Sequence, residues 1–305
     1  MPTKLDGIIV VDKPAGITSA GVVARVKGLL GAKKVGHTGT LDPFATGVLI
    51  CCINRATRLA RFFLKGEKTY EAELVLGTVT DTQDATGSVI RRHPLDGVSA
   101  QRIRAAAAHF VGCINQVPPA YSALKHQGIP LYEWARRGVP VEKPARPVRI
   151  DRLAVVDVNL PRVHLSVSCS SGTYIRSLCD DMGRRLGCGG HLGKLRRTVS
   201  CGFSIDQAVD LERLAACRDQ RRLDTLVIPM NEALPFFPAV VADDHLAKKI
   251  RNGMTLSQTD FTSRPATSDQ GLFKVVAPGG GLMAVLGPAA EPHRYNYCCV
   301  FSTEG

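Results

Sequence analysis

The chain has 305 residues, of which 45% are hydrophobic and 22% are charged, a balance that suits a globular protein with about two domains. No apolar run is long enough to span a membrane and the N-terminus lacks a signal-peptide pattern, so we expect neither membrane insertion nor secretion. The ten cysteines form no C-x-x-C pair, which predicts reduced thiols in a cytoplasmic protein, with neither a disulfide framework nor a zinc site.

The net charge of +12 is distributed unevenly along the chain. Residues 1–68 contain eleven Lys and Arg against four Asp and Glu, whereas residues 236–305 contain six of each. A basic excess in one part of a chain favours a polyanionic partner, because cationic side chains contact phosphates and release their counterions. A solvated basic surface is the alternative, so charge alone does not decide for nucleic acid.

In chain order, hydrophobic periodicity and turn residues predict a strand over residues 7–12, a helix over 19–30 capped by Ser19, a loop over 36–47, a strand over 48–53 and a short helix over 56–64. Strand-forming residues follow at 68–76, with Tyr70, Ala72, Leu74 and Leu76 on one face. Beyond them we expect an Ala-rich helix over 99–111, a loop over 116–128, strands over 149–158 and 163–169, and a helix over 174–186.

These elements do not alternate in a strict βαβ order, so we expect a mixed α/β sheet instead of a doubly wound one. Three prolines within 229–238 predict a boundary near Phe237, which divides the chain into residues 1–237 and a C-terminal module over 238–305. The module carries two short strand candidates, 272–277 and 282–286, and is predicted to be small and rich in β-structure.

The segment 36–47 (GHTGTLDPFATG) is the most unusual of the chain. Its glycines allow close approach of a ligand to the backbone, and Pro43 favours an extended conformation at Asp42, whose carboxylate could then face a cleft. The alternative is structural, with Asp42 capping a helix that has Pro43 at its first position. On spacing alone, the helix cap is the commoner arrangement.

Further candidate residues also have ordinary structural alternatives. Tyr70 is either a packing residue of its strand or a ring on which a nucleobase stacks. Tyr174 and Arg176 fall in the first turn of a predicted helix, where the helix dipole disfavours a cation. Either a specific anionic partner or an ordinary surface position would explain Arg176. The basic run 192–198 (LGKLRRT) is either a set of phosphate contacts or a solvated turn.

Taken together, five segments in this order resemble the bacterial tRNA pseudouridine-55 synthase family, called TruB: 36–48 (GHTGTLDPFATGV), 68–70 (KTY), 117–125 (VPPAYSALK), 169–176 (CSSGTYIR) and 195–198 (LRRT). Lys13-Pro14 is similar to the opening motif of that family. The resemblance covers residues 5–235 and implies a pseudouridine-synthase-like catalytic domain, built on a mixed, largely antiparallel sheet with flanking helices. Residues 238–305 resemble a reduced PUA-like module, whose balanced charge gives no indication of an RNA contact.

The resemblance also implies roles for six residues. Asp42, in the motif GHTGTLDP, would be the catalytic carboxylate. Residues that would contact the opened T-loop, stack on the target base, complete the site and line the uracil pocket are His37, Tyr70, Tyr174, Arg176 and Leu195. Ser171 departs from the family pattern, in which many members carry lysine, and this would remove one phosphate contact without changing the chemistry.

The implied activity is that of an isomerase that converts the T-loop uridine of tRNA, at position 55, to pseudouridine without cofactor or metal. The implied partner is tRNA, and we expect a monomer with no obligatory protein partner. A carboxylate could attack C1′ or C6, or help to form a glycal, and the sequence does not choose.

Two other functions compete with this one. Within the same class, a dyskerin-type synthase would work on a guide RNA, but members of that group often carry a basic tail and this chain ends without one. A non-catalytic RNA-binding protein would not need Asp42, Tyr70 and Arg176 together.

A guanidinium beside a buried carboxylate lowers the pKa of the carboxylate and fixes the orientation of the carboxylate group. We therefore expect Arg176 to pair with Asp42.

Overall fold

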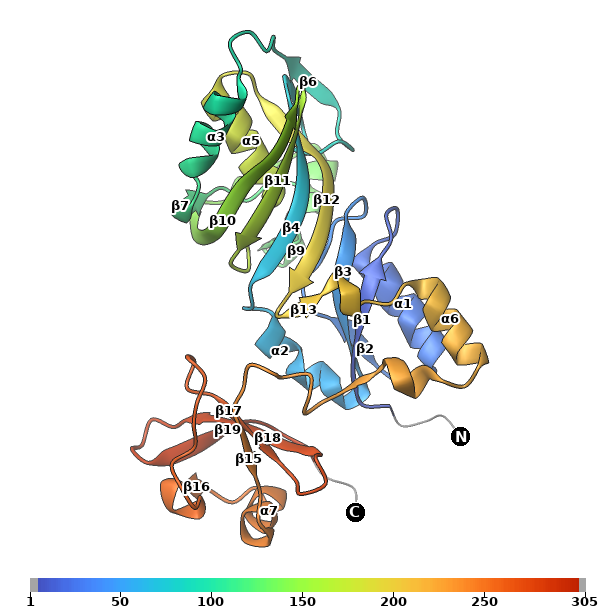
Figure 1. Cartoon of the computed structure of the whole chain (residues 1–305), viewed down its shortest axis with the longest axis vertical. Coiled ribbons are helices and arrows are strands. Elements are labelled where there is room, and N and C mark those ends of the chain that lie inside the picture. The colour runs from blue at the N-terminus through green and yellow to red at the C-terminus, as the bar shows by residue number, and fades with distance from the viewer. Residues whose placement is uncertain (1–4, 302–305) are drawn as a thin grey trace.

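The computed structural model describes residues 5–301, which form two main β-sheets with helices packed against them (Figure 1). The larger sheet has ten strands. They are β1 (Gly7–Lys13), β2 (Val35–His37), β3 (Thr46–Ile53), β4 (Lys68–Leu76), β7 (Gly112–Gln116), β10 (Arg146–Asn159), β11 (Arg162–Cys169), β12 (Gly190–Ser200), β13 (Phe203–Ser204) and β14 (Ile228–Pro229).

The strands of the larger sheet follow the order β14-β1-β3-β12-β4-β11-β10-β7, with β2 paired to β3 and β13 paired to β12. β3 and β12 are parallel, with Thr46 opposite Arg196, and the other strand pairs of this sheet are antiparallel. The prediction of a mixed, largely antiparallel sheet is therefore confirmed. The parallel junction matters for function, because it holds the end of the 36–47 loop against the middle of β12.

The helices pack on the two halves of this sheet. They are α1 (Ser19–Leu30), α2 (Ala60–Phe63), α3 (Ala100–Ala108), α4 (Leu131–Arg136), α5 (Ile175–Leu186) and α6 (Leu211–Asp219), with 3₁₀ turns η1 (Asn54–Leu59), η2 (Ile205–Gln207) and η3 (Leu223–Leu226). Helices α3 and α5 bury the core formed with β4, β10 and β11, whereas α1 and α6 cover β1 and β3. Two small hairpins project from this body, β5 (Thr78–Thr80) with β6 (Val89–Arg92) and β8 (Lys125–His126) with β9 (Ile129–Pro130).

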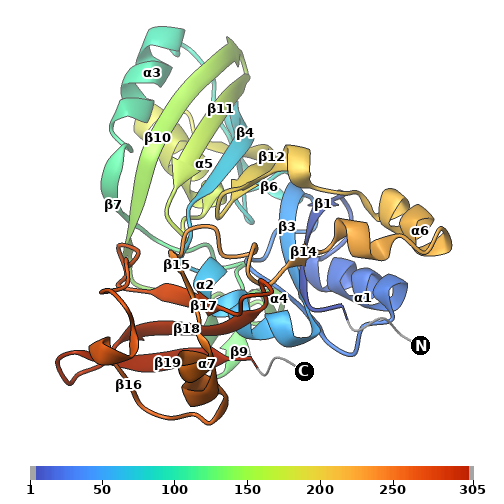
Figure 2. The same cartoon turned by 60° about the horizontal axis from the view of Figure 1, so that its bottom comes forward.

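The C-terminal module is a second sheet in the order β15-β17-β18-β19-β16, accompanied by α7 (Asp244–Arg251) and η4 (Gln258–Asp260) (Figure 2). Its strands are β15 (Ala239–Val241), β16 (Leu256–Ser257), β17 (Phe273–Val276), β18 (Leu282–Pro288) and β19 (Arg294–Val300). The module shares a hydrophobic core with the larger body, since Val285 and Phe301 belong to the same buried cluster as Ile8 and Phe63. Phe237 lies inside that shared core, and a domain boundary there stays a prediction.

Most predicted elements are present, with two corrections. Ser19 does not cap α1. Thr18 does, by accepting a hydrogen bond from the Gly21 N–H at 3.0 Å, and Ser19 is the buried first residue of the helix. The run 192–198 is not a turn but lies inside β12 at the centre of the sheet, where β3 and β4 pair with it on its two sides. A charged sequence can occupy a central strand here because its arginines have partners within the fold, as described below.

Candidate active site

The structure brings all six predicted site residues to one cavity of about 920 Å³. The cavity lies between the 36–47 loop, β4, the start of α5 and β12, and it also receives residues from the 82–86 turn and the 121–124 loop. The predicted residues that line it are His37, Asp42, Tyr70, Tyr174, Arg176 and Leu195. Such a volume is ample for a flipped-out nucleotide, since small-molecule sites occupy roughly 300–1,000 Å³.

Asp42 is presented to the cavity by a tight turn. The Ala45 N–H donates to the Asp42 carbonyl at 3.1 Å, and β3 begins directly afterwards at Thr46. No helix follows Asp42, so the helix-cap alternative is wrong. Lys13 stabilises this turn, because its buried ammonium donates hydrogen bonds to the Pro43 and Ala45 carbonyls at 3.1 and 2.6 Å.

Arg176 forms the predicted ion pair with Asp42. Its Nε lies 2.9 Å from Asp42 Oδ2, and its second terminal nitrogen donates to Asp42 Oδ1 at 3.3 Å, so the planar guanidinium grips both carboxylate oxygens. The Arg176 side chain is 5% exposed and that of Asp42 is 33% exposed. The surface-position alternative for Arg176 is therefore wrong, and the open side of the pair is the carboxylate that faces the cavity.

A second carboxylate, Asp84, completes the network and was missed by sequence reasoning. It is buried, and its Oδ2 lies 3.7 Å from Arg176 Nε. Its other oxygen accepts hydrogen bonds from the hydroxyls of Thr82 and Thr86 at 2.8 and 2.6 Å. Carbonyl groups of Thr82 and Tyr121 also accept from Arg176, at 3.2 and 2.8 Å. One sequence feature could have pointed to Asp84. Residues 78–86 are rich in Thr and Asp, and an ordinary turn does not need so many polar side chains.

Burial and neighbouring charges pull the pKa of Asp42 in opposite directions. Loss of solvent raises its pKa above the ordinary value, Arg176 counteracts this strongly, and Asp84 raises it further. The pKa of Lys13 is lowered by its burial to about 8, although the carboxylate of Asp42 opposes that change. Arg176 is thus the group that keeps Asp42 available as a carboxylate, as the sequence led us to expect.

Tyr70 and Leu195 form adjoining walls of the cavity from the neighbouring strands β4 and β12. Behind them lies Arg197, which is fully buried and donates to the carbonyls of Val48 at 2.7 Å and Gly39 at 3.0 Å. A phosphate contact by Arg197 is thereby contradicted, because its guanidinium is used to hold the 36–47 loop.

The other two cations of the 192–198 run have partners nearer the surface. Arg196 pairs with Asp12 at 2.8 Å, and Lys194 lies 3.8 Å from Glu73 while remaining 80% exposed. Gly47 explains why the loop can lie so close to β12. Its φ is 103°, and a Cβ atom there would come within 2.2 Å of the Arg197 carbonyl oxygen. A larger residue at 47 would push the loop away from the strand that anchors it.

Tyr174 and His37 also line the cavity. Tyr174 precedes α5, and the Gln116 side chain holds its backbone through two reciprocal hydrogen bonds of 2.8 and 3.0 Å. The Arg146 guanidinium lies 5.2 Å from the centre of its ring. His37 Nδ1 is buried without a hydrogen-bond partner among the described residues, and burial lowers the His37 pKa. A neutral imidazole with an unsatisfied nitrogen is suited to a contact with a neutral ligand group.

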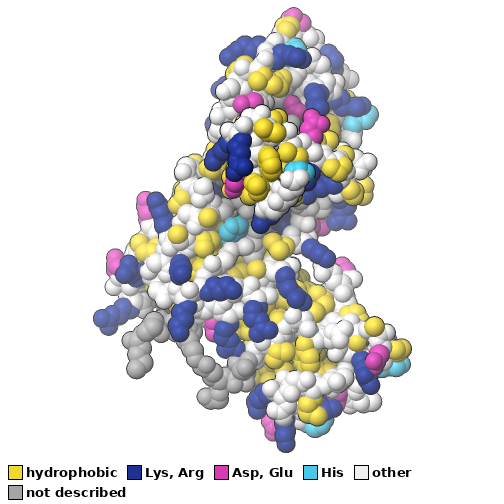
Figure 3. Space-filling model, turned by 180° about the vertical axis from the view of Figure 1, so that it is seen from behind, with side chains coloured by type: hydrophobic (Ala, Val, Ile, Leu, Met, Phe, Trp, Pro, Cys, Tyr) yellow, Lys and Arg dark blue, Asp and Glu magenta, His cyan; other side chains and the backbone are white. Residues whose placement is uncertain are grey.

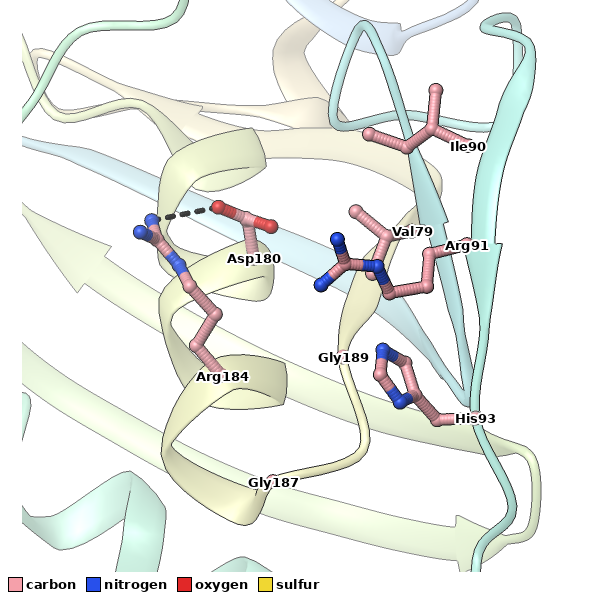
Figure 4. A pocket seen from close by; sticks show the side chains of 8 residues that line it. All are labelled: Val79, Ile90, Arg91, His93, Asp180, Arg184, Gly187 and Gly189. Atoms are coloured by element: carbon pink, nitrogen blue, oxygen red, sulfur yellow. Dashed lines mark ion pairs between the residues drawn. The ribbon is translucent and has the colours of Figure 1, made fainter.

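A smaller cavity of about 350 Å³ lies between α5 and the β5–β6 hairpin (Figure 4). Arg91 and His93 of the hairpin face Asp180 and Arg184 of the helix, and the last two are 2.7 Å apart. Asp180 also accepts from the Gln83 side chain at 3.1 Å, next to Asp84 in sequence. This cavity therefore lies next to the turn that carries Asp84, and none of the six predicted site residues lines it.

Within residues 5–301, no cluster of three or more His, Cys, Asp or Glu side chains is arranged to hold a metal ion. Over the same range, no helix has the length and hydropathy needed to cross a bilayer.

Comparison with known proteins gives concordant results over most of the chain. Residues 27–175 match the N-terminal domain of TruB family pseudouridylate synthases, and residues 176–235 match the C-terminal domain of tRNA pseudouridylate synthase B. The chain is 44% identical over 282 residues to tRNA pseudouridine synthase B of Burkholderia mallei (strain NCTC 10247), covering 92% of each chain. It is 42% identical over 285 residues to the protein of the same name from Syntrophus aciditrophicus (strain SB), covering 92% of this chain and 90% of that one.

Among solved structures, the fold is similar to a chain in the crystal structure of a Cbf5-Nop10-Gar1 complex, with a TM-score of 0.75 and 26% identity. That match covers 97% of this chain and 85% of the other. Because it extends over the C-terminal module, the predicted fold class is confirmed for both parts of the chain.

Proposed function

The chain belongs to the TruB family of tRNA pseudouridine synthases, which are isomerases, and from this premise we propose that it converts the uridine at position 55 of the tRNA T-loop, with Asp42 as the catalytic carboxylate. The observation that carries the proposal is the position of Asp42. Its carboxylate is held from behind by a buried arginine and opens on its other side into a cavity large enough for a nucleotide.

The reaction rearranges one nucleotide without gain or loss of atoms. The N1–C1′ bond breaks, the uracil turns, C5 joins C1′, and the proton lost from C5 is balanced by one gained at N1. Such an isomerisation needs neither a redox partner nor a co-substrate, so we propose that no cofactor takes part. Asp42 would act on C1′ or C6, or assist glycal formation, and each route requires the ionised carboxylate that Arg176 favours.

The cavity supplies what a detached uracil needs. A target base inside a folded loop must leave its stack, and an aromatic or apolar pocket offsets part of that cost. Tyr70 offers a ring for stacking, Leu195 an apolar wall, and Tyr174 a second ring in the same cavity. These surfaces can retain the base while it turns, because they bind it without fixing one hydrogen-bonded orientation.

The partner in this proposal is the T-arm of tRNA, and His37 would contact the opened loop. His37 lines the same cavity as Asp42. The catalytic groups named above all come from one chain, so we propose that a monomer suffices and that no protein partner is obligatory.

The direct test is to incubate the protein with an unmodified tRNA transcript and to map pseudouridine by nucleotide position. We expect product at position 55 with the parent chain and none with Asp42→Asn, which keeps the shape of the side chain but loses its nucleophilic charge. Affinity for tRNA should change little in Asp42→Asn, since phosphate contacts dominate binding. Product formation by Asp42→Asn at the parent rate would refute the assignment.

A further inference from the structure

The turn over residues 82–84 contacts Arg176 on both sides of Gln83. The Thr82 carbonyl accepts a hydrogen bond from Arg176 at 3.2 Å, and the Asp84 carboxylate lies 3.7 Å from Arg176 Nε. Thr82 and Asp84 line the active-site cavity, whereas Gln83 between them does not. The distances of these two groups from Arg176 therefore depend on where Gln83 is held.

The side chain of Gln83 is bound to helix α5 through both of its polar atoms. Its Nε2 donates to Asp180 Oδ2 at 3.1 Å, and its Oε1 accepts from the Ser177 hydroxyl at 3.1 Å. The same hydroxyl lies 3.0 Å from the Val117 carbonyl. Ser177 and Asp180 are buried, and they follow Arg176 on α5 by one and four residues. Gln83 thus joins the turn to the helix that carries Arg176.

The backbone of Gln83 is in a left-handed conformation, with a φ of 63°, which a residue other than glycine adopts at a cost. The Gln83 carbonyl accepts from the Leu192 N–H at 3.0 Å, and the Ala85 N–H donates to the Leu192 carbonyl at 2.9 Å, so β12 fixes the turn from a second direction. Glycine would adopt this φ more readily. A long polar side chain at such a position, with both of its polar atoms bound, indicates that the side chain itself is used.

We propose that Gln83 is a positioning residue for the reaction. By tying the 82–84 turn to α5, it fixes Asp84 and the Thr82 carbonyl beside Arg176. Arg176 is then held in the orientation in which it pairs with Asp42. The inference rests on the proposed function, in which Asp42 is the catalytic carboxylate. A displacement of about 1 Å around a catalytic group can slow a reaction about 10²-fold, so a small shift of this turn is sufficient to slow the chemical step.

Two substitutions separate the side chain of Gln83 from its backbone conformation. Gln83→Met keeps the length of the side chain but removes both polar contacts, and Gln83→Gly removes the side chain but favours the positive φ. Single-turnover pseudouridine formation is measured at saturating unmodified tRNA, together with tRNA affinity and a thermal melt. We expect both variants to react roughly 10–100-fold more slowly than the parent chain.

Affinity for tRNA should stay at the parent value in both variants. Phosphate contacts dominate binding and come from surface cations, which Figure 3 shows spread over one face of the molecule. Gln101→Met is the matched control, because Gln101 is an exposed glutamine of α3, and it should keep the parent rate. A Gln83→Gly enzyme with the parent rate would overturn the proposal, since the side chain would then have no part in the reaction.

A double-mutant cycle with Asp84→Asn distinguishes positioning from a general loss of structure. If Gln83 acts through Asp84, Gln83→Met should slow the Asp84→Asn enzyme by a much smaller factor than it slows the parent chain. Factors that agree within about twofold would overturn the proposal, because independent effects multiply. That result would leave the proposed function intact, whereas an Asp42→Asn enzyme with the parent rate would refute the proposed function, so the two failures are distinguishable.

Discussion

Replacing Arg176 by alanine would leave Asp42 in the cavity without the cation that holds it. The pKa of Asp42 is already raised by burial, and Arg176 is the main influence that lowers it. Its removal should raise the pKa of Asp42 further, so a smaller fraction of the enzyme would carry the reactive carboxylate at a given pH. The acid limb of the pH–rate profile should therefore move to higher pH in Arg176→Ala.

The size of the effect follows from the two hydrogen bonds between Arg176 and Asp42, at 2.9 and 3.3 Å. A hydrogen bond to a charged group contributes about 1.5–3 kcal/mol, and the partial exposure of Asp42 favours the lower end of that range. The loss is then about 3 kcal/mol, which corresponds to a rate about 10²-fold lower. Arg176→Lys keeps the charge but can replace one of the two bonds, so its rate should fall about tenfold.

The assay is single-turnover pseudouridine formation with unmodified tRNA, measured across pH for both variants. Arg184→Ala is a matched control, because Arg184 lies on the same helix and pairs with Asp180 and Asp181 instead of Asp42. We expect the control to keep the parent rate and the parent acid limb. An Arg176→Ala enzyme with the parent rate and an unmoved acid limb would show that the ion pair has no part in catalysis.

Four smaller experiments test the surroundings of the site. Asp84→Asn should move the acid limb to lower pH, opposite to Arg176→Ala, because the charge of Asp84 raises the pKa of Asp42. Stacking of a base on an aromatic ring contributes about 1–3 kcal/mol, so Tyr70→Leu should slow product formation roughly 10–100-fold and Tyr70→Phe should slow it less. Equal rates in the Leu and Phe variants would argue against stacking. In the folded state the pKa of Lys13 is lowered by burial to about 8, below its ordinary value of 10.5, so the folded state releases this proton at lower pH than the unfolded chain does. Denaturant titrations should accordingly show that, between those pH values, the unfolding free energy rises with pH more steeply in the parent than in Lys13→Met, by up to about 1.4 kcal/mol per pH unit. A chain ending after Phe237 should unfold far more readily, because it loses the part of the shared core that includes Val285 and Phe301, at roughly 1.5–3 kcal/mol for each large side chain; a thermal melt like that of the full chain would contradict this.

The sequence predicts local structure well where one face of an element is buried. β4 has the predicted bounds and buries the predicted face, because the alternation over 68–76 reports directly on packing. β12 could not be found in this way. Its exposed and buried positions are both charged, and Arg197 is buried only because Val48 and Gly39 supply carbonyl acceptors from distant parts of the chain. Periodicity describes apolar burial, so a strand stabilised by buried polar contacts is invisible to it.

The residues of the candidate site also differ in how far the sequence predicts them. The six residues expected from motifs do line one cavity, and the pairing of Arg176 with Asp42 was predictable from a cation placed against the helix dipole. Asp84 was not, because it belongs to a short polar turn without apolar pattern. Its importance appears only when the fold brings it within 3.7 Å of Arg176. Partners within a buried network are set by tertiary contacts, which a motif does not encode.

The charges around the cavity also suggest why the network contains more cations than Asp42 alone would need. The buried cations near the two carboxylates Asp42 and Asp84 are Lys13, Lys68, Arg176 and Arg197, which leaves an excess of two positive charges around the base of the site. If the N1–C1′ bond breaks heterolytically, the uracil leaves with negative charge, and fixed cations in a pocket shielded from water stabilise such charge more than solvent does. The same excess attracts the phosphates that flank the target nucleotide. One arrangement of buried charge would thus favour both the entry of RNA and the cleavage step, which explains why these cations are buried beneath the reactive carboxylate instead of being exposed at the rim.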